Sequence, residues 1–112
     1  MEKKRQSDRK ALKLYLQVKA VNTGDLLGHA VDITEAGVML TSEIPIETGT
    51  GFELQLELPA EIEGIRTIQF SARSMWSAKD SETGFYNTGF EFSDLSDRDR
   101  NLITQVIKKY CF

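Results

Sequence analysis

The sequence predicts a mainly β fold, a small six-stranded antiparallel β-barrel with a C-terminal α-helix. Apolar and polar residues alternate along several short segments, which is typical of strands with one buried face. Turn-forming residues separate these segments, and the chain ends in a stretch with apolar residues at helical spacing. Closing the strands into a barrel would also remove the exposed edges that six short strands otherwise present.

Six segments are expected to form strands. They are residues 12–20, 26–34, 38–41, 52–58, 65–76 and 85–92. The first has a wholly apolar face, formed by Leu12, Leu14, Leu16, Val18 and Ala20. In the fifth, alternation places Trp76 on the inward face, and in the sixth Phe90 and Phe92 would point inward. We assign Trp76 and the phenylalanines to the core, and we expect Gly89 to permit a bend or a bulge.

The first two strands should form a hairpin whose register matters for function. A turn centred between Thr23 and Gly24 would place Asp32 opposite Tyr15, Thr34 opposite Lys13 and Gly37 opposite Lys10. The end of the second strand would then return to the point where the N-terminal segment leaves the barrel.

The C-terminal helix has a clear start. Ser96 is a suitable N-cap, and Asp97 and Asp99 in the first turn favour the positive end of the helix dipole. Lys108 and Lys109 suit the last turn. One face is apolar, formed by Leu102, Ile103, Val106, Ile107 and Tyr110.

Length and composition indicate one domain in a reducing compartment. The 112 residues are enough to bury a core without disulfides, and the single cysteine, Cys111, excludes an internal one. No stretch approaches the roughly 18 apolar residues of a membrane span, and the charged N-terminus does not resemble a signal peptide. We therefore expect a cytoplasmic protein.

Charge is distributed unevenly along the chain. Residues 1–13 hold six basic and two acidic residues, whereas the other 99 hold 8 basic and 15 acidic residues. We interpret residues 1–11 as a flexible basic arm and residues 12–112 as the barrel with its helix. An acidic body argues against binding to nucleic acid, which favours a broad basic face. The arm would suit a small anionic ligand, although a solvated tail is the alternative.

Two short motifs have the chemistry of a nucleotide site. Arg5 and Arg9 are four residues apart, Asp32 and Thr34 would project from the same strand face, and Gly37 would allow a close approach to a ligand. Together they would bring two guanidinium groups, a carboxylate and a hydroxyl to one place. That set suits a guanine nucleotide better than it suits catalysis.

The two motifs, in this order and at this separation, resemble those of the PilZ domain family, bacterial receptors for cyclic di-GMP. The family pattern is Arg-x-x-x-Arg followed by Asp or Asn-x-Ser-x-x-Gly; Thr34 replaces the serine here. Residues 70–76 and 88–92 are also similar to the family's later strands, and the helix after them fits. The resemblance covers residues 4–110.

The resemblance implies a role for each motif residue. Arg5 and Arg9 would bind a guanine edge or a phosphate, and Asp32 would accept hydrogen bonds from guanine N1–H and N2–H₂. Thr34 would contribute its hydroxyl, and Gly37 would let the backbone approach. Further candidates are Gln6, Ala36, Arg73 and Gly89. No metal site is expected, because the single histidine, His29, has no cysteine near it in the sequence.

The predicted function is therefore that of a cyclic di-GMP receptor or adaptor. Ligand binding would order the arm and create a surface for an effector protein, acting on motility, surface polysaccharide or adhesion. The alternative is a PilZ-like protein-interaction domain that does not bind cyclic di-GMP. We do not expect an enzyme, because the sequence lacks an oxyanion donor set or an orienting third group around Asp32 and Thr34.

Overall fold

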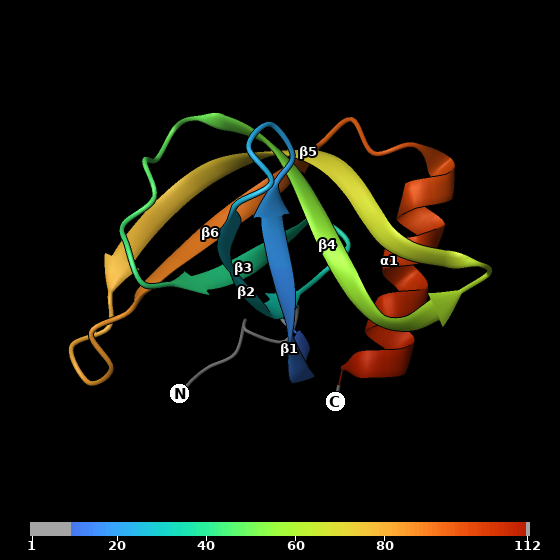
Figure 1. Cartoon of the computed structure of the whole chain (residues 1–112), viewed down its shortest axis with the longest axis horizontal. Coiled ribbons are helices and arrows are strands. Elements are labelled where there is room, and N and C mark those ends of the chain that lie inside the picture. Colours follow the sequence, from blue (N-terminus) through green and yellow to red (C-terminus); the bar gives the residue numbers. More distant parts are fainter. Residues whose placement is uncertain (1–9, 112) are drawn as a thin grey trace.

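A computed structural model describes residues 10–111 of the chain. They form a closed antiparallel barrel with strand order β1-β2-β3-β6-β5-β4, followed by one helix (Figure 1). The elements are β1 (Lys10–Ala20), β2 (Leu26–Ile33), β3 (Gly37–Ser42), β4 (Gly51–Ile62), β5 (Ile65–Lys79), β6 (Tyr86–Ser93) and α1 (Asp97–Tyr110). The predicted six-stranded barrel with a C-terminal helix is confirmed.

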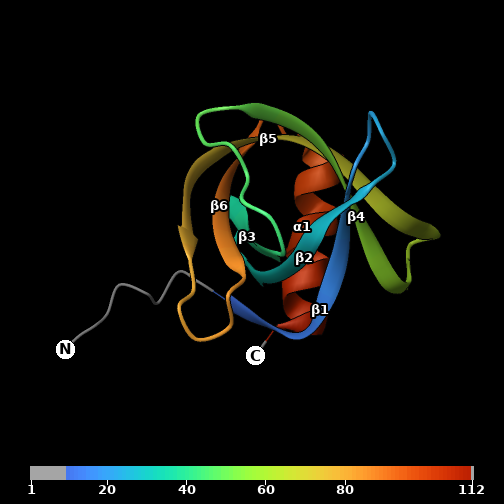
Figure 2. The same cartoon turned by 60° about the vertical axis from the view of Figure 1, so that its left-hand side comes forward.

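The barrel closes where β1 pairs with β4. Val18 lies opposite Leu56, and Ala20 lies opposite Leu54. Figure 2 shows the strands curving around a common interior, with α1 beside them. Alternating residues of β4 and β5 fill this interior, and Leu54, Leu56 and Ile68 are almost completely buried.

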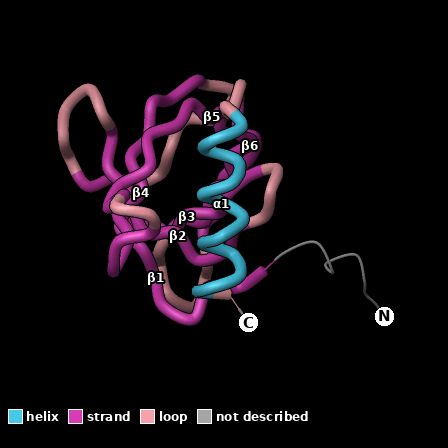
Figure 3. The backbone as a smooth tube through the Cα atoms, turned by 90° about the vertical axis from the view of Figure 1, so that its right-hand side faces the viewer, coloured by secondary structure: helices cyan, strands magenta, loops and turns pink. Residues whose placement is uncertain are grey.

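The helix packs against the barrel beside β1 and β5 (Figure 3). Its cap is the predicted one, because Ser96 accepts a hydrogen bond of 3.0 Å from the Asp99 backbone N–H. Its buried residues join the barrel core; they are Leu102, Ile103, Val106 and Tyr110. After the helix, Cys111 forms an isolated antiparallel bridge with Leu12 of β1. No described helix is long and apolar enough to cross a membrane.

The predicted register of the first hairpin is wrong at the end near the second motif. Asp32 lies opposite Ala11, not Tyr15. Lys10 lies opposite Ile33, not Gly37, which pairs with Glu91 of β6. The register shifts between Ala11 and Leu16, because β1 has more residues there than the facing part of β2. This irregularity also leaves Leu14, expected on the buried face, 42% exposed.

The inward placement of Trp76 is also wrong. The register of β5 and β6 shifts between Ser74 and Trp76, so that Met75 is an extra residue. Ser74 is fully buried, but after the bulge Trp76 is 38% exposed. Phe85, which we assigned to the core, is exposed as well because it lies in the turn before β6.

The two inward phenylalanines of β6 agree with the prediction. Phe90 is buried, and Phe92 is partly buried with its ring 5.0 Å from that of Phe70 in an edge arrangement. The bulge near Gly89 is found on the facing strand, β5, opposite the glycine.

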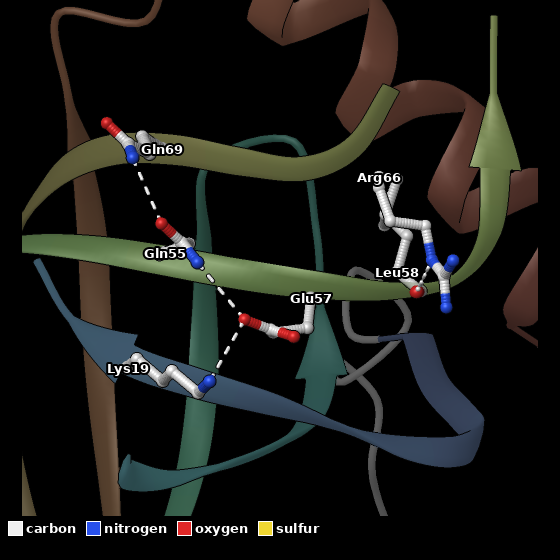
Figure 4. A network of polar contacts seen from close by, with 6 residues as sticks. All are labelled: Lys19, Gln55, Glu57, Leu58, Arg66 and Gln69. Carbon is white, nitrogen blue, oxygen red and sulfur yellow. Dashed lines mark hydrogen bonds and ion pairs between the residues drawn. The ribbon is translucent and has the colours of Figure 1, made fainter. Parts of the chain in front are cut away.

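The outer face of the barrel carries a polar network across three strands (Figure 4). Gln69 of β5 donates to Gln55 of β4 at 3.0 Å, and Gln55 donates to Glu57 at 3.1 Å. Lys19 of β1 lies 3.4 Å from the same Glu57 carboxylate. Glu57 has a lowered pKa, mainly because of the hydrogen bond from Gln55.

Candidate functional site

A pocket of about 220 Å³ opens on the outer side of the barrel where β2 turns into β3. Strands β5 and β6 form its other wall. Five of the predicted site residues line it: Asp32, Thr34, Ala36, Gly37 and Gly89. The other seven lining residues were not predicted as site residues; they are Ile33, Val38, Met39, Met75, Trp76, Phe90 and Glu91.

A bulge in β2 brings Asp32 to this pocket. Ala30 and Ile33 both point into the core although they are three residues apart, and the register with β3 shifts between Ala30 and Asp32. The extra residue leaves Asp32 half-buried, paired with Met39 of β3 and with Ala11 of β1. Asp32 therefore lies beside the first described residues of the chain.

Thr34 shapes the turn that follows. Its hydroxyl oxygen accepts hydrogen bonds from the backbone N–H groups of Ala36 at 3.1 Å and Gly37 at 3.2 Å. The Thr34 N–H donates to the Gly37 carbonyl at 2.9 Å, which closes the hairpin. The turn is held tightly by local bonds of the type that short hydroxyl side chains make.

Two glycines permit close packing around the pocket. A Cβ on Gly37 would collide with the carbonyl oxygen of Phe90 in β6. A Cβ on Gly89 would collide with the indole ring of Trp76 and approach its Cε2 atom to 2.6 Å. Each position therefore excludes a side chain for steric reasons.

Four strands contribute to one row across the pocket. Asp32, Met39, Gly89 and Trp76 are successive register partners on β2, β3, β6 and β5. The row places a carboxylate at one side and, at the other, a partly exposed indole that packs against Gly89. Such a surface can accept a flat ring against its apolar part and hydrogen-bond donors at Asp32.

The charged residues in the described lining of the pocket all have the same sign. Its two charged residues, Asp32 and Glu91, are both acidic. Arg73 is the register partner of Glu91 across β5 and β6, but Arg73 is exposed and does not line the pocket. Arg5, Gln6 and Arg9, also predicted as site residues, lie outside the described residues.

The residues that sequence reasoning missed had weak signals. Trp76 and Met75 reach the pocket only because of the bulge in β5, which alternation does not reveal. The glycine facing them, Gly89, is the available signal, because a glycine inside a strand often marks a close approach. Within residues 10–111, no group of three or more histidine, cysteine or acidic residues is placed to hold a metal ion.

Comparison with known proteins identifies the family. The sequence matches the profile of the PilZ domain over residues 3–109. A search of curated protein sequences gives no match. Because the profile covers most of the chain, it establishes family membership independently of the fold.

Several solved structures have a similar fold. The Bacillus subtilis inhibitor of motility, MotI/DgrA, has a TM-score of 0.73 at 16% identity, over 97% of this chain and 51% of that one. The PilZ domain of Escherichia coli YcgR, solved with c-di-GMP, has a TM-score of 0.71 at 14% identity, over 95% and 90%. The K. pneumonia MrkH–c-di-GMP complex has a TM-score of 0.74 at 13% identity, over 96% and 52%.

This chain thus spans about half the length of MotI and MrkH but most of the YcgR domain. At these identities the structures establish the fold, and the profile establishes the family. The chain belongs to the PilZ domain family.

Proposed function

We propose that this protein is a cyclic di-GMP receptor or adaptor that binds its ligand in the pocket beside Asp32. One observation carries the proposal most strongly. Asp32 pairs with Ala11, so the second motif lies where the segment containing Arg5 and Arg9 joins the barrel. The two motifs of the family pattern, 23 positions apart between Arg9 and Asp32, therefore have a short path to each other.

The charge of the pocket supports a role for the arm. A dinucleotide with two phosphates would meet only acidic charges, Asp32 and Glu91, on the described lining. Arg5 and Arg9 would supply the missing positive charge and could bind phosphate or the guanine O6/N7 edge through two parallel hydrogen bonds. The described pocket is also smaller than the roughly 300 Å³ at which ligand sites usually begin. We infer that the arm forms part of the site.

The remaining contacts would favour guanine. Asp32 would accept hydrogen bonds from guanine N1–H and N2–H₂, a donor pair that adenine lacks. The indole of Trp76 offers a partly exposed aromatic surface against which a purine could stack. Gly37 lets β6 pack closely at the Phe90 carbonyl, and Gly89 lets the Trp76 indole lie against the backbone, which positions the ring at the pocket.

Thr34 has a different role in this proposal. Its oxygen already accepts two backbone hydrogen bonds within the turn, so its main contribution is to fix the position of Asp32 and Gly37. Ala36 would then contribute backbone contacts, while Arg73 and Gln6 would be peripheral. The site as proposed binds and orients a ligand and has no part that would carry out chemistry on it.

Two of the similar structures, those of the YcgR domain and MrkH, contain c-di-GMP, which supports this ligand class. Ordering of the arm on the ligand would create the surface that an effector protein recognises, in the cytoplasm, where the sequence leads us to expect the protein. Motility and adhesion are the processes on which we expect such an effector to act.

Calorimetric titration of cyclic di-GMP into the protein, with GTP and cyclic di-AMP as control ligands, tests the proposal. Asp32→Ala and Arg9→Ala should each weaken binding about 5- to 150-fold, the equivalent of roughly 1–3 kcal/mol for one bidentate base contact. Asp25→Ala is the matched control, because Asp25 is an exposed acidic residue in the turn at the opposite end of β2.

Equal affinity of the wild-type and both site variants would exclude this pocket as the binding site. No binding of cyclic di-GMP by the wild-type protein would instead favour the alternative, a PilZ domain that acts only through protein contacts.

A further inference from the structure

The opposite end of the β2–β3 hairpin carries an exposed apolar surface. Leu26 is 51% exposed, Ile44 is 65% exposed and Phe85 is 44% exposed. All three line a hollow of about 310 Å³, together with Leu27 and other residues of β2 and β3. We call the surface formed by Leu26, Leu27, Ile44 and Phe85 the apolar groove. Its exposed side chains gather at one place, which is typical of a binding surface rather than of scattered surface residues.

The apolar groove is separate from the pocket beside Asp32. Leu26 and Asp32 are six residues apart on β2, a separation of about 20 Å at the rise of an extended strand. The pocket is reached from the β2–β3 turn, whereas the groove lies where β2 begins and β3 ends. A partner in the groove would therefore leave the pocket accessible.

Acidic residues surround the groove. Glu43 lines it, and Asp25 directly precedes Leu26. The N–H of Asp80 donates to the Phe85 carbonyl at 2.8 Å, which brings Asp80 to the same edge, and the N–H of Glu82 in that turn donates to the Asp80 carboxylate.

The basic residues near this rim have other contacts. Lys19, the register partner of Leu26, has its ammonium 3.4 Å from Glu57. Lys79 lies over the ring of Tyr86, 6.0 Å from its centre. The acidic residues named at this rim outnumber the basic ones, and one of the two lysines is paired with Glu57.

We propose that the apolar groove is a docking site for an amphipathic helix of a partner protein, with apolar residues facing the groove and Lys or Arg residues along its flanks. Apolar side chains would fill the hollow, and the basic flanks would meet Asp25, Glu43 and Asp80. A helix suits the site because β2 and β3, whose ends line the groove, already have a neighbouring strand on each side, and a helix can present apolar and basic residues on separate faces.

The same charges disfavour two other occupants. A second copy related by a two-fold axis would bring the acidic rim of one chain against that of the other. An anionic membrane surface would repel the rim as well. The proposal concerns a surface outside the cyclic di-GMP site and does not require that ligand.

A labelled synthetic peptide of leucine and lysine, arranged to form an amphipathic helix, is the probe. Its binding to the full chain is followed by fluorescence anisotropy and by NMR shifts of the groove residues. Ile44→Ser and Phe85→Ser should each weaken binding about tenfold, because each removes a large apolar side chain from the contact. Glu43→Lys should weaken it and reduce its dependence on salt.

Leu14→Ser is the matched control, because Leu14 is a similarly exposed apolar residue on β1 and does not line the groove. It should leave the affinity unchanged, and a peptide with glutamate in place of lysine should not bind.

Three results would overturn the proposal. They are absent binding of the basic peptide, equal binding by wild type, Ile44→Ser and Phe85→Ser, and equal binding of the acidic peptide. A dimer in analytical ultracentrifugation that Ile44→Ser abolishes would assign the groove to a second copy and would also overturn it.

Discussion

The β4–β5 hairpin and the strands around Asp32 are built differently. From Gly51 to Glu57, β4 pairs with β5 in one unbroken register, and alternate residues are buried. Around Asp32, the register shifts in β1, in β2 and near the end of β5. Regular pairing directs apolar side chains into the core. After a bulge, residues that alternation would place inside face the surface instead.

The two regions contribute different side chains to the molecule. The regular hairpin supplies buried leucines and the buried Phe70, and its outer face is polar. The irregular region supplies a half-buried carboxylate, an exposed indole and two glycines with no room for a side chain. The pocket that we propose as the binding site lies where the barrel departs from its regular pattern, and substitutions in the two regions should therefore have different consequences.

The largest expected effect is on the free energy of unfolding, and it comes from comparing a leucine-to-alanine substitution in the two regions. Leu54→Ala in the regular hairpin removes a fully buried side chain and should lower the free energy of unfolding by about 2–5 kcal/mol. Leu14→Ala in the irregular part of β1 should change it by no more than about 0.5 kcal/mol, because Leu14 is largely exposed. Urea denaturation measures both, and similar losses would contradict the distinction between the regions.

A second comparison uses glycine. Gly37→Ala introduces a methyl group against the Phe90 carbonyl oxygen, so either β3 or β6 must move, and we expect a loss of roughly 1–3 kcal/mol. Gly51→Ala, at the start of β4, is the matched control because a Cβ there has no neighbour within 4 Å. Thermal unfolding should show a lower Tm for Gly37→Ala only. An unchanged Tm in both variants would mean that there is more room between the paired strands β3 and β6 than the structure indicates.

Sequence reasoning predicted the regular parts of this fold well. Apolar and polar residues alternate along Phe52–Leu58 and Ile68–Ser74. This pattern fixes which side chains face the core, because a shift of one residue would expose the apolar ones. The N-cap at Ser96 was also predicted correctly, because its signal lies in a few neighbouring residues. A bulge was expected only near Gly89, and it lies on the facing strand, β5. The bulges in β1 and β2 were not predicted, because each depends on how two strands fit together in space.

The candidate site shows the same division. Asp32, Thr34 and Gly37 were found from their spacing, and they do line one pocket. Trp76 was assigned to the core because the alternation of β5 was extended through the bulge at Met75. The spacing of Ala30 and Ile33, three residues apart and both apolar, was the signal in the sequence that β2 is irregular there.

A smaller effect is expected at Thr34, in the irregular region. Thr34→Val keeps the shape but removes the oxygen that accepts from the N–H groups of Ala36 and Gly37. The loss should be about 0.5–1.5 kcal/mol, because the exposed Ala36 N–H can bond to water instead. Thr34→Ser retains the oxygen and should stay close to wild type. If Thr34→Val and Thr34→Ser denature at the same urea concentration, the hydroxyl does not hold the turn.

The smallest effect is expected on the outer face of the regular hairpin. The hydrogen bond from Gln55, with Lys19 nearby, lowers the pKa of Glu57 below its ordinary value of 4.5. A lowered pKa in the folded state means that ionised Glu57 favours folding above that ordinary value. The contribution disappears as the pH falls through the lowered value.

NMR titration of Glu57 tests this directly. In Gln55→Ala, the pKa of Glu57 should rise toward 4.5, because its largest cause is gone. The stability difference between wild type and Glu57→Gln should likewise shrink as the pH falls below 4.5, and salt should weaken it because the pair is accessible to solvent. If the pKa is unchanged in Gln55→Ala, the network in Figure 4 is not what sets it. Even then the outer face of the hairpin would differ from its core, since the core is stabilised mainly by buried apolar side chains, whereas a polar surface can be rearranged without moving the strands.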